Sequence, residues 1–267
     1  MKMKTSQIFL FLFIVSFAIS TANAQSNLTQ SPYTDGETLT YEGKVSKAII
    51  RGISVAEVKF SVSAAPNKKD YIVDSEAISK GSLLRLFRFK FLEKISSTVD
   101  GKTFSILRSV KRDEQGDRVR DSEAIFDYAQ KTVTYVETDP NDSARPPRRI
   151  ASAIENNTYD LVAGVYAMRR LPLAIGKTFY LNVSDSGLIY KVPVRVTARE
   201  MQSSVLGKKI CFRVEPEIFG SGRMIEQKGS MILWITDDER RLPLRAQINT
   251  GIGRVEVKLR KAEIKKA

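Results

Sequence analysis

The chain has 267 residues, in which 43 Lys and Arg outnumber 30 Asp and Glu to give a formal net charge of +13. It contains one cysteine and no histidine. An internal disulfide is therefore excluded, and the commonest general base and zinc ligand are both missing. The positive charge favours anionic neighbours such as phospholipid head groups, lipopolysaccharide or cell-wall polymers, although it also serves solubility alone.

Residues 1–24 have the pattern of a secretory signal peptide. Two lysines precede an apolar run from Ile8 to Ile19, and the small residues Ala22 and Ala24 end the segment where a signal peptidase cleaves. The run is too short to favour a membrane span. We therefore expect a periplasmic, soluble mature chain from Gln25. No cysteine follows the cleavage site to carry a lipid, and export argues against nucleic acid as a partner.

The first half of the mature chain predicts strands. Apolar and polar residues alternate over 56–62, as in a strand with one buried face. The segment 81–92 fits a strand or a helix, and its alternating phenylalanines favour a strand. Hairpin turns are indicated at Asp100-Gly101 and over 113–116.

Two segments in the middle of the chain break this alternation. Residues 138–157 are rich in proline and charge, which predicts a long polar loop. Residues 158–171 predict a helix, with Thr158 or Asp160 as the N-cap. Three apolar residues share one face of this helix: Leu161, Val165 and Met168. Five arginines flank the loop as either a solvated face or an anion-binding cluster: Arg145, Arg148, Arg149, Arg169 and Arg170.

Alternation returns in the last third of the chain, over 179–183, 190–196, 210–214, 242–248 and 255–259. The stretch 231–245, MILWITDDERRLPLR, places acidic residues beside the only tryptophan. A hairpin turn at 237–240 explains it better than an acid/base pair, because adjacent carboxylates in a turn point apart. We expect Asp237 to bond the turn backbone and Pro243 to mark an edge or bulge. Cys211 lacks an activating histidine and is interpreted as a small filler residue.

The strands present more apolar surface than one helix can cover. About a dozen one-faced strands need a matching area of cover, and a helix of about thirteen residues shields only a few of them. The sheet must therefore curl, either into a closed barrel or β-spiral, or into a half-barrel that wraps the helix and leaves an apolar groove. The predicted fold is mainly β, one large curved antiparallel sheet with a single short helix, in one domain over 25–267.

The chain also carries an ordered set of residues: Gly36-Glu37-x-Leu39-x-Tyr41; Phe87-x-Phe89-x-Phe91; Asp160, Tyr166 and Arg169; Gly176, Glu200, Gly207, Cys211 and Pro216; and Trp234-x-Thr236-Asp237-Asp238-x-x-Arg241-x-Pro243. In these it resembles the exported bacterial proteins grouped as domain of unknown function 3108. The resemblance implies a Gram-negative envelope location and no established activity. A second, weaker similarity is to the lipoprotein-carrier superfamily, whose half-barrels often contain a hairpin like Trp234–Leu244.

These observations lead to a functional hypothesis. We expect a non-enzymatic protein, without catalytic residues, metal or cofactor, that binds a hydrophobic or amphipathic envelope component such as a lipid, lipopolysaccharide or a lipoprotein segment. The candidate ligand contacts are Phe87, Phe89, Phe91, Tyr166, Arg169 and Trp234. The alternative is an envelope-integrity or scaffolding protein, a closed and self-packed barrel that contacts envelope proteins through its surface.

Overall fold

The computed structural model describes residues 31, 33–47, 50–82, 85, 88, 90–250 and 253–264. The predicted signal peptide, Phe87 and Phe89 lie outside these residues. The named elements are fifteen strands and one helix: β1 (Glu37–Lys47), β2 (Ile50–Ala64), β3 (Tyr71–Ser79), β4 (Phe91–Val99), β5 (Ile106–Gln115), β6 (Arg118–Asp127), β7 (Thr132–Thr138), β8 (Arg148–Ala153), β9 (Thr158–Tyr159), α2 (Leu161–Arg169), β10 (Thr178–Asp185), β11 (Leu188–Ser204), β12 (Gly207–Pro216), β13 (Gly229–Thr236), β14 (Pro243–Thr250) and β15 (Gly253–Ile264).

All fifteen strands belong to one continuous sheet. Its order is β8-β7-β6-β5-β4-β3-β2-β1-β15-β14-β13-β12-β11-β10-β9, so β1 pairs with β15 and joins the two ends of the chain. Every pairing is antiparallel except that of β9 with β10. The sheet edges, β8 and β9, are neighbours in sequence, and no ladder joins them in the described residues. The sheet is therefore open, and the closed-barrel alternative is wrong.

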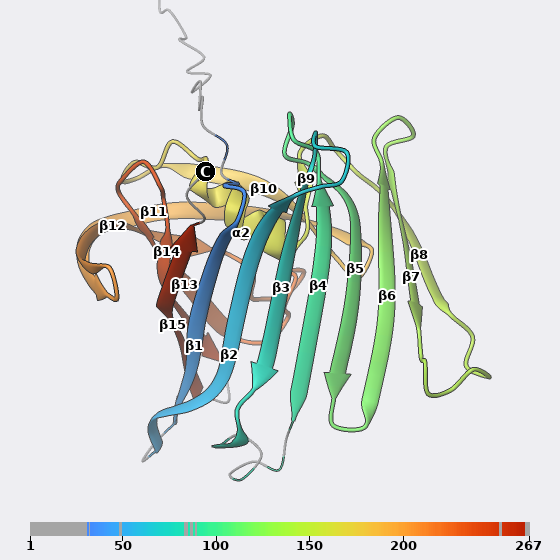
Figure 1. Ribbon diagram of the computed structural model, residues 1–267, viewed down its shortest axis with the longest axis horizontal. Coiled ribbons are helices and arrows are strands. Elements are labelled where there is room, and N and C mark those ends of the chain that lie inside the picture. Colours follow the sequence, from blue (N-terminus) through green and yellow to red (C-terminus); the bar gives the residue numbers. More distant parts are fainter. Residues whose placement is uncertain are drawn as a thin grey trace, which may run out of the picture.

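The sheet curls around α2, as the shortage of helical cover predicts. One apolar core contains Val73 of β3, Tyr166 of α2 and Val194 of β11, although β3 and β11 lie far apart in the sheet order. In Figure 1, α2 lies between the front strands and the strands β10–β12 that cross behind them. Two smaller clusters fill the rest of the curve, one between β1 and β12–β15 and one over β5–β8. The strands thus cover most of their own apolar face.

The curl brings the β10–β11 turn against β7 and β8. At Gly187, where φ is +82°, a Cβ would lie 2.5 Å from Tyr135 Cβ and 3.1 Å from Ile150 Cβ. Only glycine fits this approach without displacing its neighbours. The β10–β11 turn therefore contacts β7 and β8 through packing, without a hydrogen-bonded ladder.

Three sequence predictions change in detail. Within the predicted loop 138–157, residues 148–153 form β8, which pairs with β7 and packs Ile150 against the β5–β8 cluster. The helix is shorter than 158–171, because Asp160 caps it. In the segment 81–92, Gly81, Ser82 and Arg85 are helical and β4 begins at Phe91. A continuous strand there is wrong because the chain must reverse between antiparallel neighbours β3 and β4.

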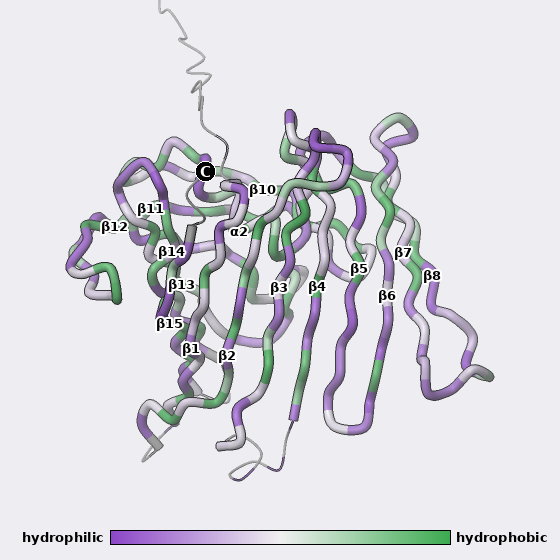
Figure 2. Tube along the Cα trace, viewed as in Figure 1, coloured by the Kyte–Doolittle hydropathy of each residue, from purple (hydrophilic) through white to green (hydrophobic). Residues whose placement is uncertain are grey.

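Side-chain polarity follows the pleat. Hydrophilic and hydrophobic residues alternate along the front strands, and hydrophilic residues dominate β5 and β6 (Figure 2). No helix in the described part of the chain combines the length and the apolar character needed to cross a bilayer.

Candidate functional site

Helix α2 is fixed to the sheet at both ends. At its start, Asp160 Oδ1 accepts a hydrogen bond from Ala163 N at 2.7 Å, and Oδ2 accepts one from Ser109 Oγ at 3.1 Å and another from Ser97 Oγ. Burial raises the pKa of the Asp160 carboxyl. At its end, buried Arg169 donates to Glu37 Oε1 at 2.6 Å and Oε2 at 3.0 Å. These contacts therefore hold both ends of α2 against the sheet.

An apolar pocket lies between one face of α2 and strands β10–β13. Its volume is about 70 Å³. The lining side chains share an apolar character: Leu161, Gly164, Val165, Met168, Leu181, Val183, Val192, Val194, Pro216, Ile218, Met224 and Met231. Three of the six methionines in the chain are in this set. Methionine is flexible and polarizable, so the walls can adapt to an apolar guest.

The pocket owes part of its space to Gly164 in the middle of α2. A Cβ at this position would meet only Val183 Cγ2, at 3.9 Å, which is an ordinary contact distance. Glycine inside a helix costs up to about 1 kcal/mol relative to alanine. Gly164 is thus a residue that disfavours the helix, at a position where a larger side chain would enter the pocket.

A second, polar cavity adjoins the apolar pocket. It has a volume of about 180 Å³ and shares Pro216 and Met231 with the pocket. Its charged lining comes from β11, β12 and the segment that follows β12: Arg195, Glu215, Glu217 and Arg223. An apolar pocket next to a charged cavity offers separate surroundings to the two ends of an amphipathic molecule.

Two other cavities have charged lining side chains that form ion pairs or hydrogen bonds within the protein. A cavity of about 50 Å³ near the start of α2 contains Asp160 and Lys111. Burial opposes the charge of Lys111, but its ion pair with Glu93 at 2.7 Å prevails and raises the pKa of the amine. A larger space, about 400 Å³, lies over β2–β5 on the face opposite the core, where Lys94 pairs with Glu76 at 3.1 Å.

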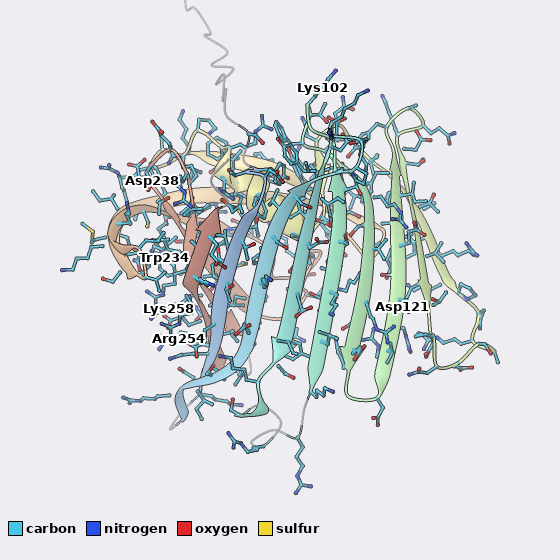
Figure 3. All side chains as sticks on the ribbon, viewed as in Figure 1. Lys102, Asp121, Trp234, Asp238, Arg254 and Lys258 are labelled. Atoms are coloured by element: carbon cyan, nitrogen blue, oxygen red, sulfur yellow. The ribbon has the colours of Figure 1, made fainter. Side chains whose placement is uncertain are left out.

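Four of the six predicted ligand contacts lie in the described residues, and none of the four lines the apolar pocket. Tyr166 and Arg169 lie together, with Arg169 Cζ 5.0 Å from the centre of the Tyr166 ring. Trp234 belongs to a separate cluster beside β13–β15, where its Nε1 donates to Glu200 (Figure 3). Phe91 is partly exposed at the start of β4. Their contact with a ligand stays a prediction.

The sequence signal for the pocket was the predicted helix face of Leu161, Val165 and Met168, all of which line it. Gly164, Met224 and Met231 were missed. The five arginines around 145–170 do not form one cluster. Arg169 is buried in its ion pair with Glu37, whereas Arg170 Cζ lies 4.0 Å from the centre of the Phe104 ring.

The stretch 231–245 is a hairpin. Asp238 Oδ1 accepts hydrogen bonds from Thr236 Oγ1 at 2.7 Å and Arg241 N at 3.3 Å, so Asp238 and not Asp237 bonds the turn backbone. Asp237 pairs with Arg199 instead, at 2.6 Å. Pro243 lies opposite Ile235 at a register shift, as the bulge interpretation requires. In the part of the chain that the structure describes, no group of three or more Cys, Asp and Glu side chains could hold a metal ion.

Comparisons with known proteins identify a family and solved structures that resemble the chain. The family model described as protein of unknown function (DUF3108) matches residues 38–260. A search of curated proteins finds no match. Among solved structures, the chain is similar to a beta-barrel-like protein of the domain of unknown function DUF1849 from Brucella abortus, with a TM-score of 0.60 and 8% sequence identity over 88% of this chain and 100% of that chain.

A DUF1089 family protein from Pseudomonas aeruginosa has a TM-score of 0.37 and 11% identity, over 74% of this chain and 92% of that chain. The likeness to the Brucella protein shows a shared fold, a curved sheet of barrel-like form.

Proposed function

This chain belongs to the DUF3108 family of proteins of unknown function, and we propose that it is a soluble, non-enzymatic periplasmic protein that binds the acyl chain of an amphipathic envelope lipid. The proposed ligand site is the pocket between α2 and β10–β13. The proposed location rests on the signal-peptide pattern of residues 1–24.

The observation that carries this proposal is the composition of the pocket wall. Every lining side chain is apolar, so the pocket offers neither a nucleophile nor a proton donor, and binding is the chemistry open to it. An apolar cavity of about 150 Å³ in another protein stays dry and binds benzene. A pocket of about 70 Å³ is smaller, so it suits one end of a hydrocarbon chain.

The energetics favour a weak, reversible complex. Each buried methylene contributes about 0.8 kcal/mol, so four methylenes contribute about 3 kcal/mol before the cost of immobilising the chain. Met168, Met224 and Met231 can change rotamer to extend the contact along a longer chain. We therefore expect acyl chains of different lengths to be accepted.

The test is to fill the pocket from α2. We expect the wild-type protein to bind decyl maltoside, below its micelle concentration, in isothermal titration calorimetry. Gly164→Leu should weaken this binding at least about tenfold because its side chain takes the place of the acyl chain, and Gly164→Ala should have a smaller effect. Gly164→Ala should also raise stability, because alanine favours the helix.

Ile125→Ala is the matched control. It removes an apolar side chain that is 52% exposed on β6, outside the pocket, and should leave binding unchanged. A Gly164→Leu protein that is folded by circular dichroism and binds decyl maltoside like the wild type would refute the pocket as the site. Native mass spectrometry of protein purified gently from the periplasm should in addition show a lipid adduct.

A further inference from the structure

The polar cavity beside the apolar pocket has a defined charge arrangement. Glu217 Oε2 lies 2.9 Å from Arg223 Nη2, and Glu217 Oε1 pairs with Arg195 Nη2. Arg195 belongs to β11, whereas Glu217 and Arg223 lie between β12 and β13. One carboxylate thus holds two guanidinium groups from separate segments toward the same space, at the border of the apolar pocket.

Resting on the function proposed above, we propose that Arg195 and Arg223, held by Glu217, bind the phosphodiester of a phospholipid whose acyl chain occupies the pocket beside α2. The ligand class is therefore a phospholipid or lysophospholipid with a singly charged phosphodiester, and not a neutral glycolipid.

The charges of this group match such a head group. Two arginines and one glutamate leave a net charge of +1, which one phosphodiester neutralises. The neighbouring Glu215 does not change this balance, because it is paired with Arg213 at 2.9 Å. Glu215 also accepts a hydrogen bond from Thr197 Oγ1 at 2.8 Å.

The arginines retain donors for a ligand. A guanidinium has five N–H groups, and each of the two arginines places one terminal nitrogen on Glu217. The planar fork of the remaining donors suits two oxygens of a phosphate. The side chains of Arg195 and Arg223 are 59% and 36% exposed, so a head group would reach them from solvent while its chain enters the pocket.

The two sites also share their wall. Pro216 and Met231 line both the apolar pocket and the charged cavity, so the two spaces are adjacent across these two residues. A ligand that occupies both spaces must join an acyl chain to a charged group through a short linker, as a lysophospholipid does through its glycerol.

The experiment compares three probes by isothermal titration calorimetry below the micelle concentration: decanoyl lysophosphatidylglycerol, decyl maltoside and inorganic phosphate. We expect the wild type to bind the lysophospholipid at least about tenfold more tightly than the maltoside, and to bind phosphate alone much more weakly than either. Raising the salt concentration should reduce the preference for the lysophospholipid.

The double variant Arg195→Gln/Arg223→Gln should bind the lysophospholipid no more tightly than the maltoside, with maltoside affinity unchanged, because only the Glu217 carboxylate remains of the charged group. Arg199→Gln is the matched control, because Arg199 is an arginine of the same strand β11 that lines neither cavity, and its partner Asp237 keeps an ion pair with Arg241. This variant should keep the wild-type preference. Gly164→Leu should weaken both amphiphiles.

The outcomes separate the two proposals. If the double variant keeps the preference for the lysophospholipid, the arginine assignment is wrong while acyl-chain binding stands. If phosphate alone binds as tightly as the lysophospholipid, the cavity is a site for free phosphate and not for a lipid. If Gly164→Leu affects neither amphiphile, the acyl-chain site itself is wrong.

Discussion

Glu37 and Arg169 show how single residues hold distant segments of the sequence together. Their side chains, 1% and 5% exposed, form a bidentate ion pair between β1 and the end of α2, and Arg169 also donates to Arg240 O at 3.1 Å. Other residues of the ordered set by which the sequence resembles its family are also linked in the fold, Trp234 to Glu200 and Thr236 to Asp238. This set therefore includes residues whose side-chain contacts connect separate elements of the fold.

Breaking the buried pair should be costly. We expect Glu37→Ala to lower the free energy of unfolding by about 3–5 kcal/mol, because it leaves the Arg169 charge buried without its partner. Glu37→Met/Arg169→Met should lose much less, since no unpaired charge remains. Urea unfolding followed by circular dichroism measures both, and a loss below about 1 kcal/mol for Glu37→Ala would show that the pair is not buried in solution.

Cys211 illustrates a residue whose surroundings determine its chemistry. It is fully buried in the cluster that also contains Trp234, and burial raises the pKa of its thiol to about 12. We expect iodoacetamide at pH 8 to leave the native protein unmodified and to alkylate it fully in urea, because only the thiolate reacts. Intact-protein mass spectrometry reads the result, and rapid alkylation of the native protein would contradict the buried position.

At the level of the element, α2 depends on Asp160. The carboxylate caps the helix and receives hydrogen bonds from Ser97 of β4 and Ser109 of β5, so one side chain both starts the helix and fixes it to the sheet. Asp160 is one of the two N-cap residues expected from the sequence. Its two serine partners could not be expected in this way, because they lie more than fifty positions away in the chain.

This arrangement predicts a pH dependence. The folded-state pKa of Asp160 is raised, so the folded protein holds this proton more tightly than the unfolded chain does. The resulting stabilisation is fully present below the ordinary aspartate value of about 3.9 and is lost as the pH rises through the folded-state pKa. Asp160→Asn keeps the cap but cannot titrate.

We therefore expect the stability of the wild type, measured relative to Asp160→Asn by urea unfolding, to fall as the pH is raised above the ordinary aspartate value of about 3.9. A difference between the two proteins that rises over this range would mean that the folded state favours the charged carboxylate, and that burial is not the dominant influence.

At the level of the whole molecule, the contact of Gly187 with Tyr135 and Ile150 closes the curl. Gly207, the first residue of β12, has a similar φ, +80° against +82°, but a Cβ there would have no neighbour within 4 Å. Comparing alanine variants of the two glycines therefore separates the cost of backbone strain from the cost of displacing the residues that pack against the β10–β11 turn.

We expect Gly207→Ala to cost about 1 kcal/mol, from backbone strain alone. Gly187→Ala should cost about 2–4 kcal/mol, because the added methyl must also displace Tyr135. Thermal or urea unfolding of the two variants measures the difference. Equal losses would indicate that the β10–β11 turn does not pack on β7 and β8 in solution.

Sequence alone determined the features that depend on neighbouring residues. Alternation over 56–62 or 190–196 indicates which residues of one strand share a face, and the spacing of Leu161, Val165 and Met168 indicates one face of a helix. Both repeats are set by the geometry of the local backbone. The same patterns showed that the strands present more apolar surface than one helix can cover. The prediction of a sheet that curls around one helix followed from this excess and is confirmed.

Tertiary structure decided what depends on residues distant in sequence. Three such relations join separate strands. The edges β8 and β9 do not pair with each other in the described residues, Gly187 packs against Tyr135, and Pro216 and Met231 line both an apolar pocket and a cavity with two arginines. Periodicity carries no information about the curvature of a sheet. For this reason Tyr166 and Trp234, expected at a ligand, are packed in separate clusters of the core, while Gly164, which the sequence did not single out, lines the pocket.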